Sequence, residues 1–234
     1  MDLEVWSVVL LLVLQWLVVR IILVVPIFGL QHDRLLETAS ARSVAGSRKL
    51  KLFVFLGSGG HTGEMLRLLE NYQETLLRPG QTTLTVGVSD EASLARFRHT
   101  LGAYLDSQQI EVQVCRFGKA REVGASKLQS AKSVVQTLAG AMWTLTWLKW
   151  QFVGQPHLVL LNGPGTCCII AGWLKLLEIV TTTRSKIVYV ESLARTSTLS
   201  LSGKLLYPLV DEFVVQWSEL CDKYGRARCF EILV

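Results

Sequence analysis

The sequence predicts an α/β protein, a Rossmann-like, doubly wound and mostly parallel sheet that follows one N-terminal transmembrane helix. From residue 49 to residue 234, short apolar runs suited to strands alternate with helical patterns, which is typical of parallel α/β sheets. The first of these strands ends in a glycine-rich loop that opens a helix. Residues 1–30 are predicted to form the membrane anchor, residues 31–48 a linker, and residues 49–234 the α/β domain.

Composition limits the functions that the chain can have. The 234 residues are 50% hydrophobic and carry a net charge of +5, with a mean hydropathy of +0.36. A modest basic excess fits a membrane surface or a phosphate-bearing ligand better than duplex DNA, and we find no nucleic-acid-binding motif. Five cysteines without a CxxC pair argue against a disulfide framework or a zinc site and indicate a reducing compartment.

The N-terminal segment is the most apolar part of the chain. Residues 5–25 contain only Gln15 and Arg20 as strongly polar side chains, and about 20 apolar residues are enough to cross a bilayer. A cleaved signal peptide fits less well, because Asp2 and Glu4 make the start acidic and the small residues 39–41 lie far downstream. A buried core helix is the other alternative.

Basic residues flank this span on its C-terminal side alone. The positive side of a span stays in the cytosol, so the sequence predicts a luminal N-terminus and a cytosolic domain. Arg20 is expected to extend toward the cytosolic interface.

The elements of the α/β domain are predicted from periodicity and from turn residues. Helices are expected from His61, from Ser89, and over Ser126–Phe152 and Cys167–Ile179. Strands are expected over Leu52–Leu56, Thr82–Val88, Ile110–Phe117, His157–Leu161, Lys186–Val190 and Phe213–Trp217, with a possible short strand in Arg228–Val234.

The loop Gly57-Ser58-Gly59-Gly60 lies between the first strand and its helix. Glycines let the backbone approach a ligand closely, and a helix N-terminus directs N–H groups and a positive dipole end toward an anion. We therefore expect a phosphate above this loop, although a merely tight turn is the alternative. His61 ends the loop, where it could donate to a phosphate or act as a general base; a structural histidine is the alternative.

Three further candidates follow other strands. Asn162-Gly163-Pro164-Gly165 repeats the pattern of an apolar strand, a glycine loop and a helix start, so it predicts a second binding loop, or another tight turn. Arg121, in a loop flanked by glycines, could bind a diphosphate or be a solvated charge. Glu191 directly follows the fifth strand; it could serve the site, or cap a helix or pair with Arg195.

Trp143, Trp147 and Trp150 recur at helical spacing within the long predicted helix. Core packing is the default interpretation of an aromatic stripe. Contact with a membrane interface is the alternative, because tryptophan favours that zone and an anchored protein lies close to it.

Four motifs in this order resemble one family, the membrane-anchor subunit of the endoplasmic-reticulum UDP-N-acetylglucosamine transferase that acts second in dolichol-linked oligosaccharide synthesis. The resemblance covers about residue 49 to the C-terminus. The glycine loop is also similar to that of the bacterial transferase that adds N-acetylglucosamine to a lipid-linked peptidoglycan precursor. The motifs are residues 57–61, 162–166, 188–192 and 199–204.

The resemblance implies a GT-B glycosyltransferase fold split across two chains, of which this chain is the acceptor-side half, and a soluble subunit that carries the UDP-sugar half. It implies transfer of N-acetylglucosamine onto N-acetylglucosaminyl-diphosphodolichol, with no metal and no cofactor. The expected catalytic residues are His61 and Glu191. The expected diphosphate contacts are Gly57, Ser58, Gly59, Gly60, Thr62, Arg121, Asn162, Gly163 and Gly165.

The apolar C-terminal tail is the expected partner contact. A free apolar terminus usually frays, so a covering chain explains Phe230, Ile232, Leu233 and Val234; packing against this domain's own sheet is the alternative. Two other functions compete with the transferase subunit. The chain could be a membrane scaffold without a catalytic contribution. An NAD-type oxidoreductase fits poorly, because Thr62 stands where the third glycine of the dinucleotide motif would be.

Overall fold

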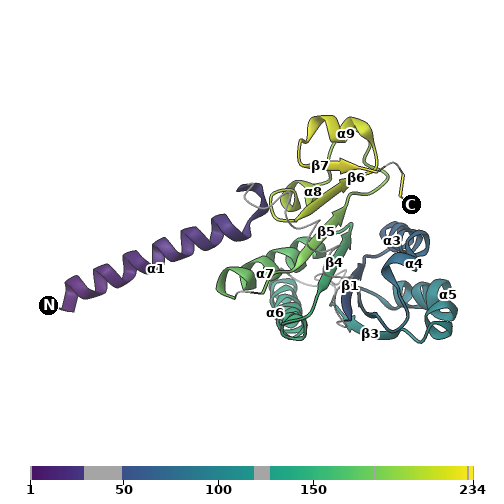
Figure 1. Cartoon of the computed structure of the whole chain (residues 1–234), viewed down its shortest axis with the longest axis horizontal. Helices are drawn as coiled ribbons and strands as arrows, with labels where there is room; N and C mark the ends of the chain where they lie inside the picture. The colour runs from purple at the N-terminus through teal and green to yellow at the C-terminus, as the bar shows by residue number, and fades with distance from the viewer. Residues whose placement is uncertain (1, 29–48, 119–126, 182, 231, 234) are drawn as a thin grey trace.

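In the computed structural model, residues 2–28, 49–118, 127–181, 183–230 and 232–233 are described here. They form a seven-stranded sheet in the order β3-β2-β1-β4-β5-β6-β7, in which every pair of neighbours is parallel. An apolar helix, α1 (Asp2–Val24), extends away from the sheet (Figure 1). The predicted linker at residues 31–48 lies outside the described residues.

The predicted strands are confirmed to within a few residues, and the possible last strand is a short one that begins one residue earlier than predicted and ends at Cys229. The strands are β1 Leu50–Leu56, β2 Thr82–Val88, β3 Glu111–Arg116, β4 His157–Asn162, β5 Lys186–Val190, β6 Glu212–Val215 and β7 Ala227–Cys229. The remaining helices are η1 Pro26–Phe28, α3 Gly60–Asn71, α4 Gln73–Leu76, α5 Glu91–Ser107, α6 Lys127–Phe152, α7 Thr166–Val180, α8 Leu201–Leu206 and α9 Ser218–Lys223.

The strand order changes direction between β1 and β4, which pair with Val54 opposite Leu160. From β1 the chain continues outward to β2 and β3, and from β4 it continues outward on the other side. Loops that leave two adjacent strands in opposite directions leave a crevice at the carboxyl ends of those strands. The two glycine-containing loops predicted from the sequence both lie at this switch point.

Each face of the sheet has its own apolar core. Alternate side chains of a strand point to opposite faces, and β1 directs Leu52, Val54 and Leu56 into the core with α3 and α5. Phe53 and Phe55 point into the other core, beneath α6 and α7. In Figure 1, α3, α4 and α5 lie on one side of the sheet, and α6 and α7 lie on the other.

The tryptophans of α6 do not pack in the core, so the default interpretation from the sequence is wrong. Trp143 is 78% exposed, Trp147 is 50% exposed and Trp150 is 80% exposed. The core-facing side of the same helix is formed by Ala141, Leu145, Leu148 and Phe152. Three large aromatic side chains therefore form an outward apolar face, which we call the tryptophan face.

The N-terminal helix has the length and the composition of a membrane span. Residues Val5–Val24 have a mean hydropathy of 2.6, and almost none of them is buried by other parts of the protein. The buried-core alternative is thus wrong. Near its C-terminal end, α1 contacts α7, and Val24 is buried there.

Candidate functional site

The first glycine loop presents a helix N-terminus to the surface. Gly59 has a φ of 66°, a left-handed conformation that favours glycine. No side chain caps the start of α3, so its first N–H groups are available to a ligand. A Cβ at Gly60 would meet no atom within 4 Å, and Ser58, Gly59 and Gly60 are exposed. The loop has the open, electropositive geometry that suits an anion.

The second loop packs directly against the first. Gly163 has a φ of 99°, and a Cβ built on it would lie 2.3 Å from Cγ of His61. A Cβ on Gly57 would similarly lie 2.7 Å from Cδ of Pro164. These glycines are required so that the imidazole and the two loops can approach one another. Gly165, at the start of α7, is exposed and has open space around it.

Thr62 holds the first loop from below instead of facing the surface. Its buried hydroxyl donates to the carbonyl of Gly57 and lies 2.8 Å from the hydroxyl of Ser93. The Ser93 hydroxyl donates to the same carbonyl over 3.0 Å. The Thr62 side chain, which the sequence predicted to contact diphosphate, therefore fixes the loop backbone.

Glu64 is a central residue of the site, and sequence reasoning missed it. Its carboxylate accepts a hydrogen bond from Nδ2 of Asn162 over 2.9 Å and another from Oγ of Ser192 over 2.7 Å. Oε2 lies 3.9 Å from Nδ1 of His61, which is longer than a hydrogen bond but close enough for a charge pair. Asn162 also donates to the carbonyl of Val190 over 3.2 Å. Its amide thus positions Glu64, and the loops after β1, β4 and β5 meet on one carboxylate.

The charges of His61 and Glu64 stabilise each other. The pKa of His61 is raised, because the Glu64 carboxylate favours the imidazolium more than partial burial disfavours it, and Asn162 and Glu191 act in the same direction. Burial alone would raise the pKa of Glu64, but interactions with His61, Ser192 and Asn162 outweigh it and the pKa is lowered. Nδ1 of His61 is buried toward Glu64, so Nε2 is the ring nitrogen left for a ligand.

Glu191 is not the exposed carboxylate that its position after β5 suggested. It is 1% exposed, and Oε2 accepts hydrogen bonds from the backbone N–H and the hydroxyl of Ser200 over 3.1 and 3.0 Å. A Cβ on Gly203 would lie 2.0 Å from the same oxygen. Ser200 in turn caps α8. Glu191 does not itself cap a helix. It binds the residue that caps α8, which makes it an anchor of the segment before α8.

The C-terminal tail packs in part on its own domain. The N–H of Leu233 donates to Oε1 of Gln216 over 3.3 Å, and Nδ2 of Asn71 donates to the carbonyl of Leu233 over 3.0 Å. Leu233 is buried, whereas Phe230 is 57% exposed and Ile232 is 56% exposed. Arg121 and Val234 lie outside the described residues.

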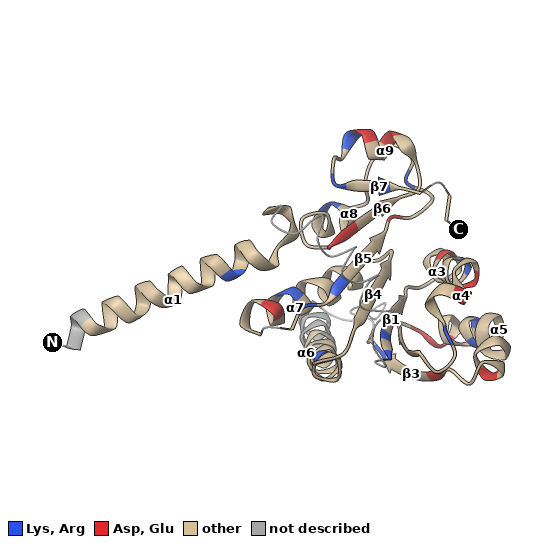
Figure 2. Ribbon diagram, in the orientation of Figure 1, with Lys and Arg blue, Asp and Glu red and all other residues tan. Residues whose placement is uncertain are grey.

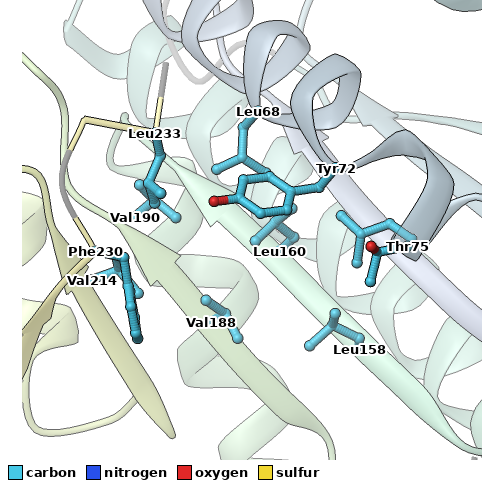
Figure 3. Close-up of a pocket in the computed structure, with 11 residues that line it drawn as sticks. Leu68, Tyr72, Thr75, Leu158, Leu160, Val188, Val190, Val214, Phe230 and Leu233 are labelled. Carbon is cyan, nitrogen blue, oxygen red and sulfur yellow. The ribbon is translucent and has the colours of Figure 1, made fainter.

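An apolar groove runs along the tail. It has a volume of about 350 Å³ and lies on a stretch of the sheet face, beside α3 and α4 (Figure 3). We call it the tail groove. Its lining includes Leu68 and Tyr72 from α3 and its C-terminal end, Leu158, Leu160, Val188, Val190 and Val214 from the sheet, and Phe230 and Leu233 from the tail.

A parallel sheet with two glycine-containing loops at its switch point, an uncapped helix N-terminus and a histidine beside it place the chain among the doubly wound α/β proteins. The chain belongs to the Alg14 family: residues 52–233 match the family described as oligosaccharide biosynthesis protein Alg14 like.

Relatives support this assignment over almost the whole chain. The chain is 49% identical over 233 residues to the UDP-N-acetylglucosamine transferase subunit ALG14 of Kluyveromyces lactis, covering 98% of this chain and 96% of that protein. It is 48% identical over 225 residues to the protein of the same name from Saccharomyces cerevisiae, covering 93% of each.

Among solved structures, the chain is similar to a UDP-N-acetylglucosamine 2-epimerase from Listeria monocytogenes, described as putative. The identity is 14% and the TM-score is 0.47, over 76% of this chain and 42% of that one.

Proposed function

We propose that this chain is the membrane-anchoring, acceptor-binding subunit of a heteromeric UDP-N-acetylglucosamine transferase. The reaction adds the second N-acetylglucosamine to N-acetylglucosaminyl-diphosphodolichol at the cytosolic face of the endoplasmic reticulum. The observation that carries the proposal is the meeting of the two loops and His61 at the switch point of a chain of the Alg14 family. A membrane span and an anion site on one chain suit a substrate that has both a lipid tail and a diphosphate.

In this reaction the acceptor hydroxyl oxygen forms a bond to the anomeric carbon of the sugar, and the bond from that carbon to UDP breaks. Inversion at the anomeric carbon follows from a single displacement, and the hydroxyl proton is released. We assign the acceptor diphosphate to the N–H groups at the start of α3, around Ser58, Gly59 and Gly60. His61, whose raised pKa favours the protonated form, donates from Nε2 to the diphosphate.

The surrounding polar residues act through the loops and His61. Glu64 stabilises the imidazolium and turns Nε2 outward, and Asn162 holds Glu64 in place. Gly163 leaves room for the ring, while Thr62 and Glu191 anchor loop segments. We regard these groups as positioning residues.

The membrane attachment has two parts in this proposal. The span Val5–Val24 has its N-terminus in the lumen and leaves the domain in the cytosol, as the flanking charges predict. The tryptophan face of α6, Trp143, Trp147 and Trp150, is exposed and rests in the interfacial zone of the same leaflet, where tryptophan is stabilised.

The partner is a soluble subunit that binds UDP-N-acetylglucosamine. The described residues form one parallel sheet, and we assign its switch point to the acceptor. The sugar donor therefore binds to the second chain. The tail groove and the exposed Phe230 and Ile232 are apolar and adjoin one another. We assign this surface to the partner, because burying it would remove apolar area from water.

One reconstitution tests the function. Vesicles that contain the full chain, with or without the soluble subunit, receive labelled UDP-N-acetylglucosamine and N-acetylglucosaminyl-diphosphodolichol. Transfer that requires both chains supports the proposal, whereas the absence of transfer with both chains present contradicts it. A His61→Ala protein that recruits the partner and keeps full transfer would instead support the scaffold alternative.

A further inference from the structure

The end of the membrane span is joined to the end of α7 by an arginine. Nε of Arg20 donates to the carbonyl of Ile179 over 2.9 Å, and its guanidinium also donates to the carbonyls of Glu178 and Thr181. These carbonyls lie at the C-terminus of α7, where helix carbonyls lack intrahelical partners and the dipole end is negative. Arg20 was expected from the sequence to reach toward the interface, but it caps another helix.

A second arginine, from the segment after α7, caps the C-terminal end of α1 in turn. Nη2 of Arg184, which follows α7, donates to the carbonyl of Leu23 over 3.1 Å, at the C-terminal end of α1. Each helix end is thus capped by an arginine from the other segment. Val24 is buried at this contact. We call the pair of contacts the helix-end joint.

The helix-end joint adjoins a buried ionic cluster, because Glu178 belongs to both. The Glu178 carboxylate accepts hydrogen bonds from Nζ of Lys149 over 3.3 Å and from Nζ of Lys175 over 3.1 Å. Lys175 also pairs with Asp211 over 3.0 Å, and Ser185 N–H donates to Glu178 over 2.5 Å. Breaking a buried pair leaves an uncompensated charge, so the residues that receive Arg20 are held firmly by α6, by α7 and by the starts of β5 and β6.

The other end of α7 lies at the candidate site. The helix begins at Thr166, directly after Gly165 of the second loop. Its 15 residues correspond to a rigid rod of roughly 22 Å at the usual rise per residue. The hydrogen bonds of Arg20 place α1 at the other, C-terminal end of α7, which precedes β5. One helix therefore connects the joint to the loop that packs against His61.

We propose that Arg20 and Arg184 are positioning residues that fix the tilt of the domain relative to the bilayer, so that the anion-binding loops are held at a set distance from the bilayer that contains the acceptor. The effect on the acceptor rests on the proposed function. The fixed tilt itself does not, and it is measured separately.

The first measurement uses the full chain in lipid nanodiscs, with a fluorescent amino acid in place of the exposed Glu219 of α9. Energy transfer to labelled lipid headgroups reports the distribution of distances between the domain and the bilayer. Arg20→Leu makes the span more apolar, so insertion is retained, and Arg184→Ala lies outside the span. Gln15→Leu, at an exposed position on the same helix, is the matched control.

We expect a narrow distribution in the unmodified protein and in Gln15→Leu, and a broad one in Arg20→Leu and in Arg184→Ala. An unchanged distribution in both arginine variants overturns the proposal. A shift of equal size in the glutamine control also overturns it, because the effect would then belong to the polarity of the span.

The second measurement compares two acceptors in the presence of the partner subunit: a long polyprenyl acceptor in the bilayer and a short-chain acceptor dispersed in water. We expect Arg20→Leu to lower turnover of the bilayer acceptor by about 10-fold, since misplacement of reacting groups is costly, and to leave the short-chain acceptor unchanged. Equal loss on both acceptors overturns the positioning role. If the unmodified protein transfers to neither acceptor, the proposed function fails, while the distance measurement still decides the joint.

Discussion

Replacing Glu64 by glutamine removes the negative charge behind His61 and nearly preserves the shape of the side chain. The carboxylate oxygen and Nδ1 of the imidazole are 3.9 Å apart. Two unit charges at that distance attract by about 1 kcal/mol in bulk water and by about 4 kcal/mol near a protein surface. Both groups are partly exposed, so the lower part of this range applies. We expect roughly a tenfold loss of kcat/KM near neutral pH, which corresponds to about 1.4 kcal/mol.

The sign of the pH effect separates two roles for His61. The pKa of His61 is raised by Glu64, so the charged form persists to higher pH in the unmodified protein. If the imidazolium binds the diphosphate, activity is present at low pH and is lost as the pH rises through this pKa. In Glu64→Gln the pKa of His61 falls, and the loss of activity moves to lower pH.

The assay is the pH profile of kcat/KM for the lipid acceptor, measured with the partner subunit present. Ser192→Ala is the matched control, because it removes a hydrogen bond to the same carboxylate and leaves the charge. A descending limb at the same pH in Glu64→Gln refutes the charge pairing. A profile in which activity rises through the His61 pKa refutes the donor role and assigns a general base.

Four further outcomes are expected. Protease added to sealed microsomes should digest the domain after residue 49, and full protection would contradict the assigned topology. His61→Ala and Gly60→Val should each lower turnover, the first by about 10²-fold and the second by filling the open space above the loop; near-normal turnover in folded protein would remove the loop from the site. Serine at both Phe230 and Ile232 should release the partner while the buried Leu233 keeps the tail in place, and co-purification at normal yield would falsify this. Burial lowers the pKa of His157 to about 4, so the unfolded state binds a proton more readily than the folded state. The free energy of unfolding should therefore fall by at most about 3 kcal/mol as the pH falls from 6.5 toward 4. Melting curves of His157→Gln should lack this pH dependence.

Local pattern was enough to predict the strands and the two glycine-containing loops that follow them. The apolar run of β1 is buried on both faces of the sheet, and such runs are typical of parallel sheets. The glycines at 57–60 and 163–165 mark backbone conformations that other residues adopt poorly. Because loops after parallel strands share one edge of the sheet, their proximity could also be predicted. The strand order that makes β1 and β4 neighbours could not.

The polar network of the site depends on contacts that are distant in the sequence. Glu64 lies 98 residues from Asn162 and 128 residues from Ser192, and on its own it reads as an ordinary residue on the surface of a helix. The one local signal was its position a single turn after His61 on the same helix. The burial of Glu191 could not be predicted for a related reason, because it depends on the segment before α8, which covers this side chain. Helical spacing likewise groups the three tryptophans but does not say whether another element covers them.

The parallel topology places the candidate site and the contact with α1 at opposite edges of the sheet. The two glycine-containing loops of the candidate site follow the carboxyl ends of β1 and β4, whereas α6 and α7 end where β4 and β5 begin, at the opposite edge. A strand of five to seven residues, such as β5 or β1, separates these edges by roughly 16–23 Å. The ionic cluster of Lys149, Glu178 and Asp211 and the contacts of Arg20 lie at the edge that is joined to α1. The helices that run back between the edges are therefore the direct connection between α1 and the candidate site, and α7 is the one that contacts α1 at one end and begins at the second glycine loop at the other.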